Sequence, residues 1–165
     1  GLWIDETLRR YPQDELVLQG VSLGGATVCM SMAQELPPAV RCAVSDCAFA
    51  DGREQIGHMI RTAHLPAFPL LKELCIWFHR HTGLQLEECR PLAAVARAKI
   101  PMLFVHGALD QYVSCDNARR LYEACGSEKE LHLFEGAGHA ASHYFHREEY
   151  NRTVFQFLER HLEAE

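Results

Sequence analysis

The sequence has no long apolar run and no cluster of basic residues. No stretch of about 18 uninterrupted apolar residues occurs, so no transmembrane helix is predicted. Lysine and arginine number 16 against 22 aspartate and glutamate, a formal net charge of -6. This balance argues against nucleic acid or an anionic lipid surface as a partner. The first residues also lack the basic start and apolar middle of a signal peptide. We therefore expect a cytoplasmic protein.

Metal and redox motifs are missing as well. The seven cysteines include no Cys-x-x-Cys pair, which disfavours a zinc ribbon or a thioredoxin-type motif. Their odd number favours free thiols that pack as small apolar side chains in a reducing compartment. Among the ten histidines, His139 and His143 have helical i, i+4 spacing, but Ala140 replaces the glutamate of a His-Glu-x-x-His motif. We expect no metal and no cofactor.

The chain does contain a regular alternation of strands and helices. Its 165 residues, 48% of them apolar, are enough for one domain with a core. Strands are predicted over residues 16–21, 40–45, 100–106 and 131–134. Helices are predicted over residues 2–11, 22–36, 114–125 and 144–161. Strands that are apolar on both faces and alternate with helices indicate a three-layer α/β/α fold with a mostly parallel sheet of about four strands.

Residues 52–98 interrupt this alternation between the second and third strands. Two apolar helical segments, 56–63 and 70–78, are separated by two prolines, and a third short helix begins near Pro91. One crossover helix needs far fewer residues. We therefore expect a small helical cap inserted over the carboxyl end of the sheet. The alternative is that these helices pack against its flank.

A Gly-x-Ser-x-Gly pattern occupies residues 20–24, between a predicted strand and a predicted helix. In this context Ser22 lies on a sharp turn with strained backbone and an exposed hydroxyl. Gly20 and Gly24 remove Cβ atoms that would clash in so tight a turn. The N-terminus of the next helix favours negative charge, which suits a nucleophile whose attack creates an oxyanion. The alternative role for Ser22 is an ordinary helix N-cap.

A serine nucleophile needs a base, and the base needs a third group to orient it. Asp110 follows the third predicted strand in His-Gly-x-x-Asp, and His139 follows the fourth in Gly-x-Gly-His. Carboxyl ends of parallel strands share one edge of a sheet, where Ser22 also lies. The alternative for Asp110 is a turn-forming aspartate.

The three turns that carry Ser22, Asp110 and His139 together resemble the signature turns of the α/β-hydrolase superfamily. Residues 89–107, which lead into the acid turn, are also similar to that superfamily. Within it the chain most resembles the Bem46/serine aminopeptidase S33-like hydrolases. The resemblance implies a serine hydrolase that cleaves a small-molecule ester, thioester or amide through an acyl-enzyme, without a cofactor. It assigns Ser22 as nucleophile, His139 as general base and then acid, and Asp110 as the group that orients His139.

Other residues compete for these roles. Asp46, after the second strand, is a rival acid because some lipases of the superfamily place the acid there, and Asp51 is a weaker rival. His143 and His146 are rival bases, although both are expected on the last helix or its lead-in. His106 is expected to be structural, at the end of a buried strand.

The oxyanion hole is half present in the sequence. The backbone N–H of Leu23 is the expected first donor. The resemblance implies a second donor from a loop after an earlier strand, whereas residues 1–21 hold one predicted helix and one strand. We therefore expect residues 1–165 to be a single, N-terminally truncated α/β-hydrolase domain. The bare edge of its first strand invites pairing with another chain, so a homo-oligomer is possible. The alternative function is a non-catalytic remnant or interaction module.

Overall fold

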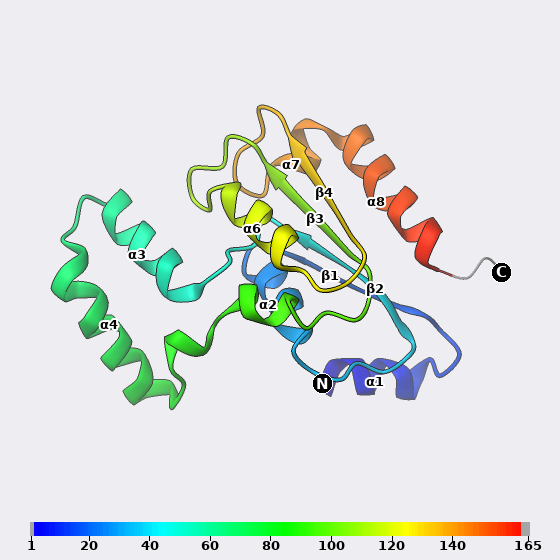
Figure 1. Ribbon diagram of the computed structural model, residues 1–165, viewed down its shortest axis with the longest axis horizontal. Coiled ribbons are helices and arrows are strands. Elements are labelled where there is room, and N and C mark those ends of the chain that lie inside the picture. Colours follow the sequence, from blue (N-terminus) through cyan, green and yellow to red (C-terminus); the bar gives the residue numbers. More distant parts are fainter. Residues whose placement is uncertain (1, 163–165) are drawn as a thin grey trace.

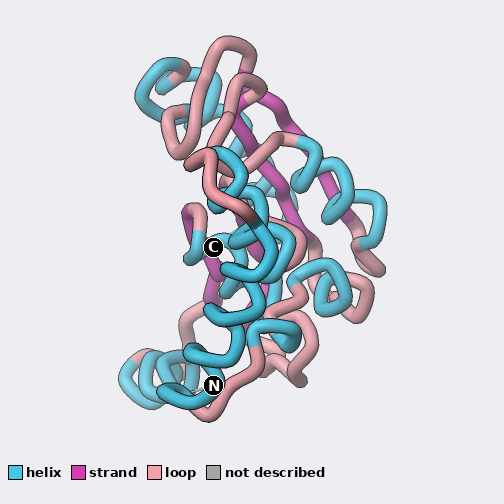
Figure 2. The backbone as a smooth tube through the Cα atoms, turned by 90° about the vertical axis from the view of Figure 1, so that its left-hand side faces the viewer, coloured by secondary structure: helices cyan, strands magenta, loops and turns pink. Residues whose placement is uncertain are grey.

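Each of the four apolar segments forms a strand, and the strands lie side by side in sequence order. The computed structural model describes residues 2–162 and shows one parallel sheet with helices on both faces (Figures 1 and 2). The strands are β1 (Leu16–Val21), β2 (Val40–Asp46), β3 (Met102–Gly107) and β4 (Lys129–Phe134). Their register places Val21 beside Asp46 and Gly107 beside Phe134, so the carboxyl ends are aligned. The predicted fold class is confirmed.

The helices follow the predicted pattern with two differences. They are α1 (Leu2–Arg10), α2 (Leu23–Ser31), α3 (Gly52–Thr62), α4 (Ala67–Thr82), α5 (Pro91–Val95), α6 (Asp116–Ala124), α7 (Ser142–Phe145) and α8 (Arg147–His161), with a 3-10 turn η1 (Leu86–Glu88). The helix expected to reach residue 36 ends at Ser31, whose hydroxyl donates to the carbonyl of Val28, and the next hydrogen bonds span only three residues. The last helix is divided because His146 has a non-helical backbone.

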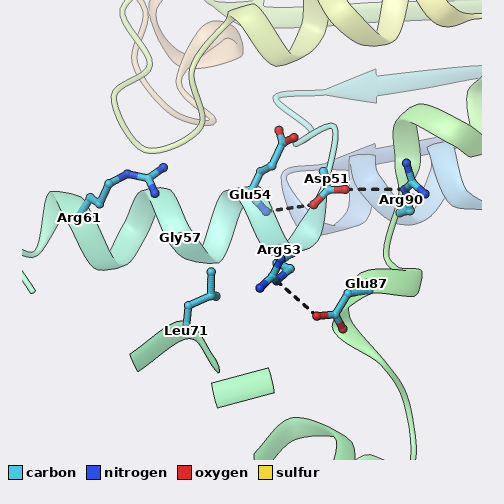
Figure 3. A pocket seen from close by; sticks show the side chains of 8 residues that line it. All are labelled: Asp51, Arg53, Glu54, Gly57, Arg61, Leu71, Glu87 and Arg90. Carbon is cyan, nitrogen blue, oxygen red and sulfur yellow. Dashed lines mark hydrogen bonds and ion pairs between the residues drawn. The ribbon is translucent and has the colours of Figure 1, made fainter. Parts of the chain in front are cut away.

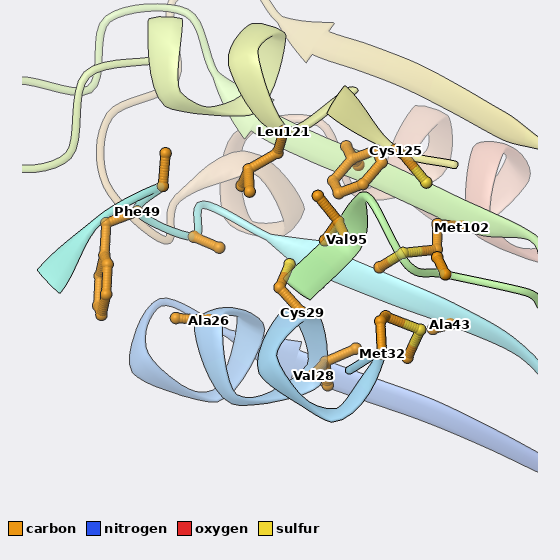
Figure 4. Packing of buried hydrophobic residues seen from close by; sticks show 14 of the residues in the cluster. Ala26, Val28, Cys29, Met32, Ala43, Phe49, Val95, Met102, Leu121 and Cys125 are labelled. Atoms are coloured by element: carbon orange, nitrogen blue, oxygen red, sulfur yellow. The ribbon is translucent and has the colours of Figure 1, made fainter. Parts of the chain in front are cut away.

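Alternate strand residues face opposite layers, as expected for a sheet covered on both sides. Ala43, Met102 and Phe104 join side chains of α2, α5 and α6 in one buried cluster (Figure 4). Val44 and Leu103 pack with α8 on the other face. Full burial of such side chains contributes about 1.5–3 kcal/mol each, so these two layers hold the strands in place.

Between β2 and β3, the helices α3 and α4 extend away from this core, whereas α5 belongs to it. In Figure 1, α3 and α4 lie on the opposite side of the sheet from α8. The helix α4 packs against α3 and η1, and none of its residues is buried. The short helix α5 begins with Pro91, as the sequence predicts. The role of residues 52–98 as a cap stays a prediction.

Across residues 2–162, none of the helices combines the length and apolar character that crossing a bilayer requires.

Candidate active site

Ser22 lies on a strained turn between β1 and α2. Its φ of 54° and ψ of -114° place it outside the regions that serine prefers. A Cβ added to Gly20 would lie 2.3 Å from the carbonyl of Gly24, so that glycine is required. The expectation of a similar clash at Gly24 is wrong, because a Cβ there meets no atom within 4 Å. The second crowded position is Gly25, where a Cβ would lie 2.7 Å from the backbone oxygen of Asp46.

Ser22, His139 and Asp110 form a hydrogen-bonded row at the carboxyl ends of β1, β4 and β3. The Oγ atom of Ser22 lies 2.8 Å from Nε2 of His139. The Nδ1 atom of His139 lies 2.7 Å from Oδ2 of Asp110. Because a carboxylate only accepts, Nδ1 carries the ring proton and Nε2 is free to accept from the hydroxyl. Ser22 occupies the N-cap position of α2, but its side chain makes no capping hydrogen bond.

Two glycines bring the acid turn and the histidine turn together. Gly136 has a φ of 74°, a left-handed conformation that favours glycine. A Cβ on Gly107 would lie 2.5 Å from the carbonyl oxygens of Ala137 and Gly138. The N–H of Leu109 also donates to the carbonyl of Ala137 at 2.9 Å. The two turns therefore meet backbone to backbone, and this contact places Asp110 beside the imidazole.

The carboxylate of Asp110 is buried and surrounded by donors. Oδ1 accepts from the backbone N–H groups of Tyr112 and Val113, each at 2.9 Å. Oδ2 accepts from His139 and lies 3.1 Å from Nε2 of His106. Burial alone would raise the pKa of this carboxyl. The hydrogen bonds from His106, Val113 and His139 outweigh burial and hold the pKa below its ordinary value.

The rival acid Asp46 is also buried, but it has a different partner. Its Oδ2 accepts from the hydroxyl of Tyr150 on α8 at 2.9 Å, and among the described residues its Oδ1 has no hydrogen-bond partner. Burial raises the pKa of Asp46, and burial together with Asp46 also raises the pKa of the Tyr150 hydroxyl. Asp46 therefore bonds to α8 instead of to the imidazole of His139.

The remaining rivals lie outside the row. Asp51 caps α3, where its side chain accepts from the N–H of Glu54 at 3.0 Å. His143 lies in α7, as expected for the lead-in to the last helix. His146 pairs through Nε2 with the carbonyl oxygen of Glu135 at 2.6 Å. The ring of His143 lies 5.2 Å from that of Tyr150, so each of these three side chains has a contact outside the row.

Sequence reasoning missed two neighbours of His139. The ring of Tyr112 lies 5.0 Å from the imidazole, and it is 49% exposed. The thiol of Cys47 is buried beside Asp110 and His139, and the three side chains bring potential metal-ligand atoms within 4.8 Å of one another. The 2.7 Å contact between the imidazole and Asp110 already shares a proton, and burial raises the pKa of Cys47 to about 12. We therefore interpret the cluster of Cys47, Asp110 and His139 as a hydrogen-bonded group and not as a metal site. No motif or spacing in the sequence pointed to Tyr112 or Cys47.

A charged groove of about 590 Å³ lies beside α3, apart from the row (Figure 3). Its lining residues are Asp51, Arg53, Glu54, Gly57, Arg61, Leu71, Glu87 and Arg90. Arg53 pairs with Glu87 at 3.3 Å, and Arg90 lies 3.9 Å from Asp51. Exposed pairs of this kind contribute at most about 1 kcal/mol each.

Several known proteins are similar to this chain in sequence or in fold. The chain is 30% identical over 143 residues to the uncharacterized protein YqkD of Bacillus subtilis, a match that covers 86% of this chain and 47% of that protein. The chain thus spans about half the length of this relative. An acylaminoacyl peptidase of Pyrococcus horikoshii superimposes with a TM-score of 0.70 at 20% identity, over 96% of this chain and 26% of that one. An esterase of Pyrococcus furiosus gives 0.72 at 18% identity, over 97% and 60%.

These structures share the α/β-hydrolase fold expected from the three turns, and together with the family match given below they confirm the superfamily. The narrower resemblance to the S33-like hydrolases is not confirmed. The sequence profile that matches is that of Peptidase_S9, over residues 4–165. Because this match spans nearly the whole chain, the protein belongs to the prolyl oligopeptidase family.

Proposed function

We propose that this chain carries the catalytic side chains of a serine hydrolase that cleaves a small-molecule carboxylic ester, thioester or amide. The observation that carries the proposal is the row in which Ser22, His139 and Asp110 are joined by contacts of 2.8 and 2.7 Å. Three residues from three strand ends meet with the donor and acceptor order that nucleophilic catalysis needs. Membership of the prolyl oligopeptidase family supports it.

In the proposed reaction, Nε2 of His139 accepts the hydroxyl proton while Oγ of Ser22 attacks the substrate carbonyl carbon. The carboxylate of Asp110 stabilises the imidazolium that forms and holds the ring in one orientation. The imidazolium then gives its proton to the leaving group, and an acyl-enzyme remains. Water, deprotonated by the same imidazole, releases the acid and regenerates the serine.

The N-terminus of α2 supplies one proposed site for the oxyanion. The N–H of Leu23 belongs to the first turn of this helix, where N–H groups have no intrahelical acceptor. No acidic side chain occupies that turn, so the positive end of the helix dipole is not neutralised. One such donor contributes about 100- to 1,000-fold in rate in a comparable site.

We further propose that residues 52–98 form a cap against which the acyl or leaving group packs. In α4 the large side chains of Phe68 and Trp77 are 79% and 56% exposed. Near the row, Leu23 and Tyr112 are also more than one-third exposed. Apolar surface that stays open around a reactive serine is suited to an apolar part of a substrate.

A fluorophosphonate probe tests the assignment directly. We expect it to label the folded protein at Ser22, with mass spectrometry of the labelled peptide as the readout. Ser22→Ala should abolish labelling. Ser31→Ala, which replaces the serine at the end of α2, should not. Label that survives Ser22→Ala, or a folded wild-type protein that takes up no label, contradicts the proposal.

The second candidate is a non-catalytic interaction module of the same fold. The observation that favours it is the position of β1, which leads into Ser22 and lies at the edge of the described sheet with β2 as its partner. Val21 on this edge is 45% exposed. This candidate predicts that the folded, monodisperse chain does not turn over p-nitrophenyl acyl esters. Turnover that is lost in Ser22→Ala rejects it.

A further inference from the structure

We propose that His106 is a positioning residue, whose single ring N–H holds both the carboxylate of Asp110 and the peptide that closes the acid turn. The sequence predicts only a structural role for this histidine. The inference concerns the same site and rests on the proposed function, because Asp110 matters to the reaction through its orientation of His139.

The contacts of the His106 imidazole show which of its two ring nitrogens carries the proton. His106 is fully buried at the end of β3. Its Nε2 lies 3.1 Å from Oδ2 of Asp110 and 2.8 Å from the carbonyl oxygen of Val113. Both neighbours are acceptors, so Nε2 must carry the hydrogen and share it between them. The histidine is therefore a donor to the acid turn.

This shared hydrogen bond closes a small ring of contacts. Val113 donates its N–H to Oδ1 of Asp110, and its carbonyl accepts from His106, which also bonds Oδ2 of the same carboxylate. With Tyr112 and His139, the two oxygens have four donors in all. Donors on both oxygens fix the plane of a carboxylate, so Oδ2 faces Nδ1 of His139 without rotation.

The state of the other ring nitrogen, Nδ1, indicates that the hydrogen bonds donated by Nε2–H are the reason why a histidine occupies position 106. Nδ1 of His106 is buried and has no hydrogen-bond partner within the described part of the chain. An unpaired buried polar atom is unfavourable, and an apolar side chain at the same place would not have one. Phe104, two residues earlier on the same face of β3, shows that this face accommodates an apolar side chain in full burial. Compared with an apolar side chain at position 106, the histidine therefore contributes the hydrogen bonds donated by Nε2–H.

Several ionisable groups lie near Asp110, and the charge of each one influences the pH at which its carboxyl ionises. They are His106 on β3, His139 after β4 and Cys47 after β2, with His58 of α3 bonded to the backbone of the acid turn, and Asp46 at the end of β2 interacts with His106 and His139 in turn. Of these, only His106 and His139 donate hydrogen bonds to the carboxylate within the described structure.

The test compares His106→Leu, which removes the donor, with His106→Gln, whose amide nitrogen reaches about where Nε2 lies. Val105→Ala serves as a matched control, because it removes buried atoms from the same strand on its other face. Carbon-13 NMR follows the ionisation of the Asp110 carboxyl against pH. We expect the midpoint to rise by about half to one pH unit in His106→Leu, because one donor to the charged form is lost. His106→Gln and Val105→Ala should keep the wild-type midpoint.

Turnover of a p-nitrophenyl ester, normalised to labelled active sites, provides the functional readout. We expect kcat to fall about tenfold in His106→Leu with KM unchanged, as for groups that orient a reactive side chain from behind. His106→Gln should restore most of it. A merely structural role predicts equal losses in His106→Gln, or a loss in Val105→Ala that matches its loss of thermal stability.

An unchanged Asp110 midpoint in a folded His106→Leu protein overturns the proposal. If that variant does not fold, His106→Asn replaces it, since its shorter amide corresponds to Nδ1 and not to Nε2. Failure of the proposed function is a separate result. In that case the wild-type protein is not labelled, and the NMR midpoints still decide whether His106 donates to Asp110.

Discussion

Two buried carboxyl groups, Asp110 and Asp46, lie at the ends of neighbouring strands, and their pKa values are shifted in opposite directions. Asp110, just beyond β3, has four hydrogen-bond donors, and its pKa lies below the ordinary value. Asp46, at the end of β2, accepts from one hydroxyl, and within residues 2–162 its other oxygen has no partner; burial raises its pKa above the ordinary value. Burial is common to both, so the hydrogen bonds from donors account for the opposite directions of the two pKa shifts.

The difference arises from the backbone around each residue. Beyond β3 the chain turns, so the N–H groups of Tyr112 and Val113 are free to bond the side chain of Asp110. At the end of β2 the backbone is already paired: the carbonyl of Asp46 accepts from Ser22, and the N–H of Cys47 donates to Val105. A carboxylate on a turn can collect backbone donors, whereas one on a paired strand depends on a distant side chain.

The strongest test of this comparison is the activity of the two amide variants. We expect Asp110→Asn to lower kcat by about 10,000-fold, because the amide does not hold His139 in the required tautomer. Asp46→Asn should stay within a few-fold of wild type. Steady-state hydrolysis of a p-nitrophenyl ester measures both. The reverse order of effects would make Asp46 the acid and remove the comparison.

Stability should show the next largest effect. Asp110→Asn should lower the free energy of unfolding by about 1–3 kcal/mol at pH 7, since a buried carboxylate loses charge-assisted hydrogen bonds. A carboxyl with a lowered folded pKa stabilises the protein above its unfolded pKa, near 3.8, and that contribution disappears as the pH falls through the folded pKa. Urea unfolding at pH 7 and at pH 3 measures the change. A difference from wild type that stays constant between these pH values contradicts the prediction.

The same measurement on Asp46→Asn should change in the opposite direction. A raised folded pKa means that the wild-type protein loses stability as the pH rises through that pKa, because the buried carboxyl must ionise. The variant cannot ionise, so its stability relative to wild type should increase between pH 4 and pH 8. We expect a gain of about 1 kcal/mol. A relative stability that falls over this range would show that Asp46 is stabilised as a carboxylate.

An effect on stability of similar size, with none on turnover, is expected when the tyrosine donor to Asp46 is removed. Tyr150→Phe should destabilise the protein by about 1 kcal/mol, the contribution of a hydrogen bond to a buried acceptor. It should leave the ester turnover unchanged, because the Tyr150 hydroxyl bonds Asp46, which lies outside the row of Ser22, His139 and Asp110. Thermal unfolding and the p-nitrophenyl assay separate the two readouts. A large loss of turnover at full stability would connect Tyr150 to the row.

Much of the architecture could be read from local patterns. Apolar segments with turn residues at their ends placed all four strands within two residues, because strand formation depends on short-range alternation and burial. Gly20 and Ser22 indicated the tight turn between β1 and α2 for a similar reason, because such a turn limits which residue types can occupy its own positions. Asp110 and His139 were found because the ends of parallel strands share one edge.

What could not be read were the contacts among segments distant in the chain. Gly25 is crowded, and Gly24 is not, because the carbonyl of Asp46 approaches one of them from β2. Asp46 and Asp110 look alike as aspartates that follow apolar strands, and only the packing of α8 and the course of the acid turn give them different donors. Residue order sets local backbone preference, whereas hydrogen bonds need distances near 3 Å that arise only when distant strands, turns and helices are packed together.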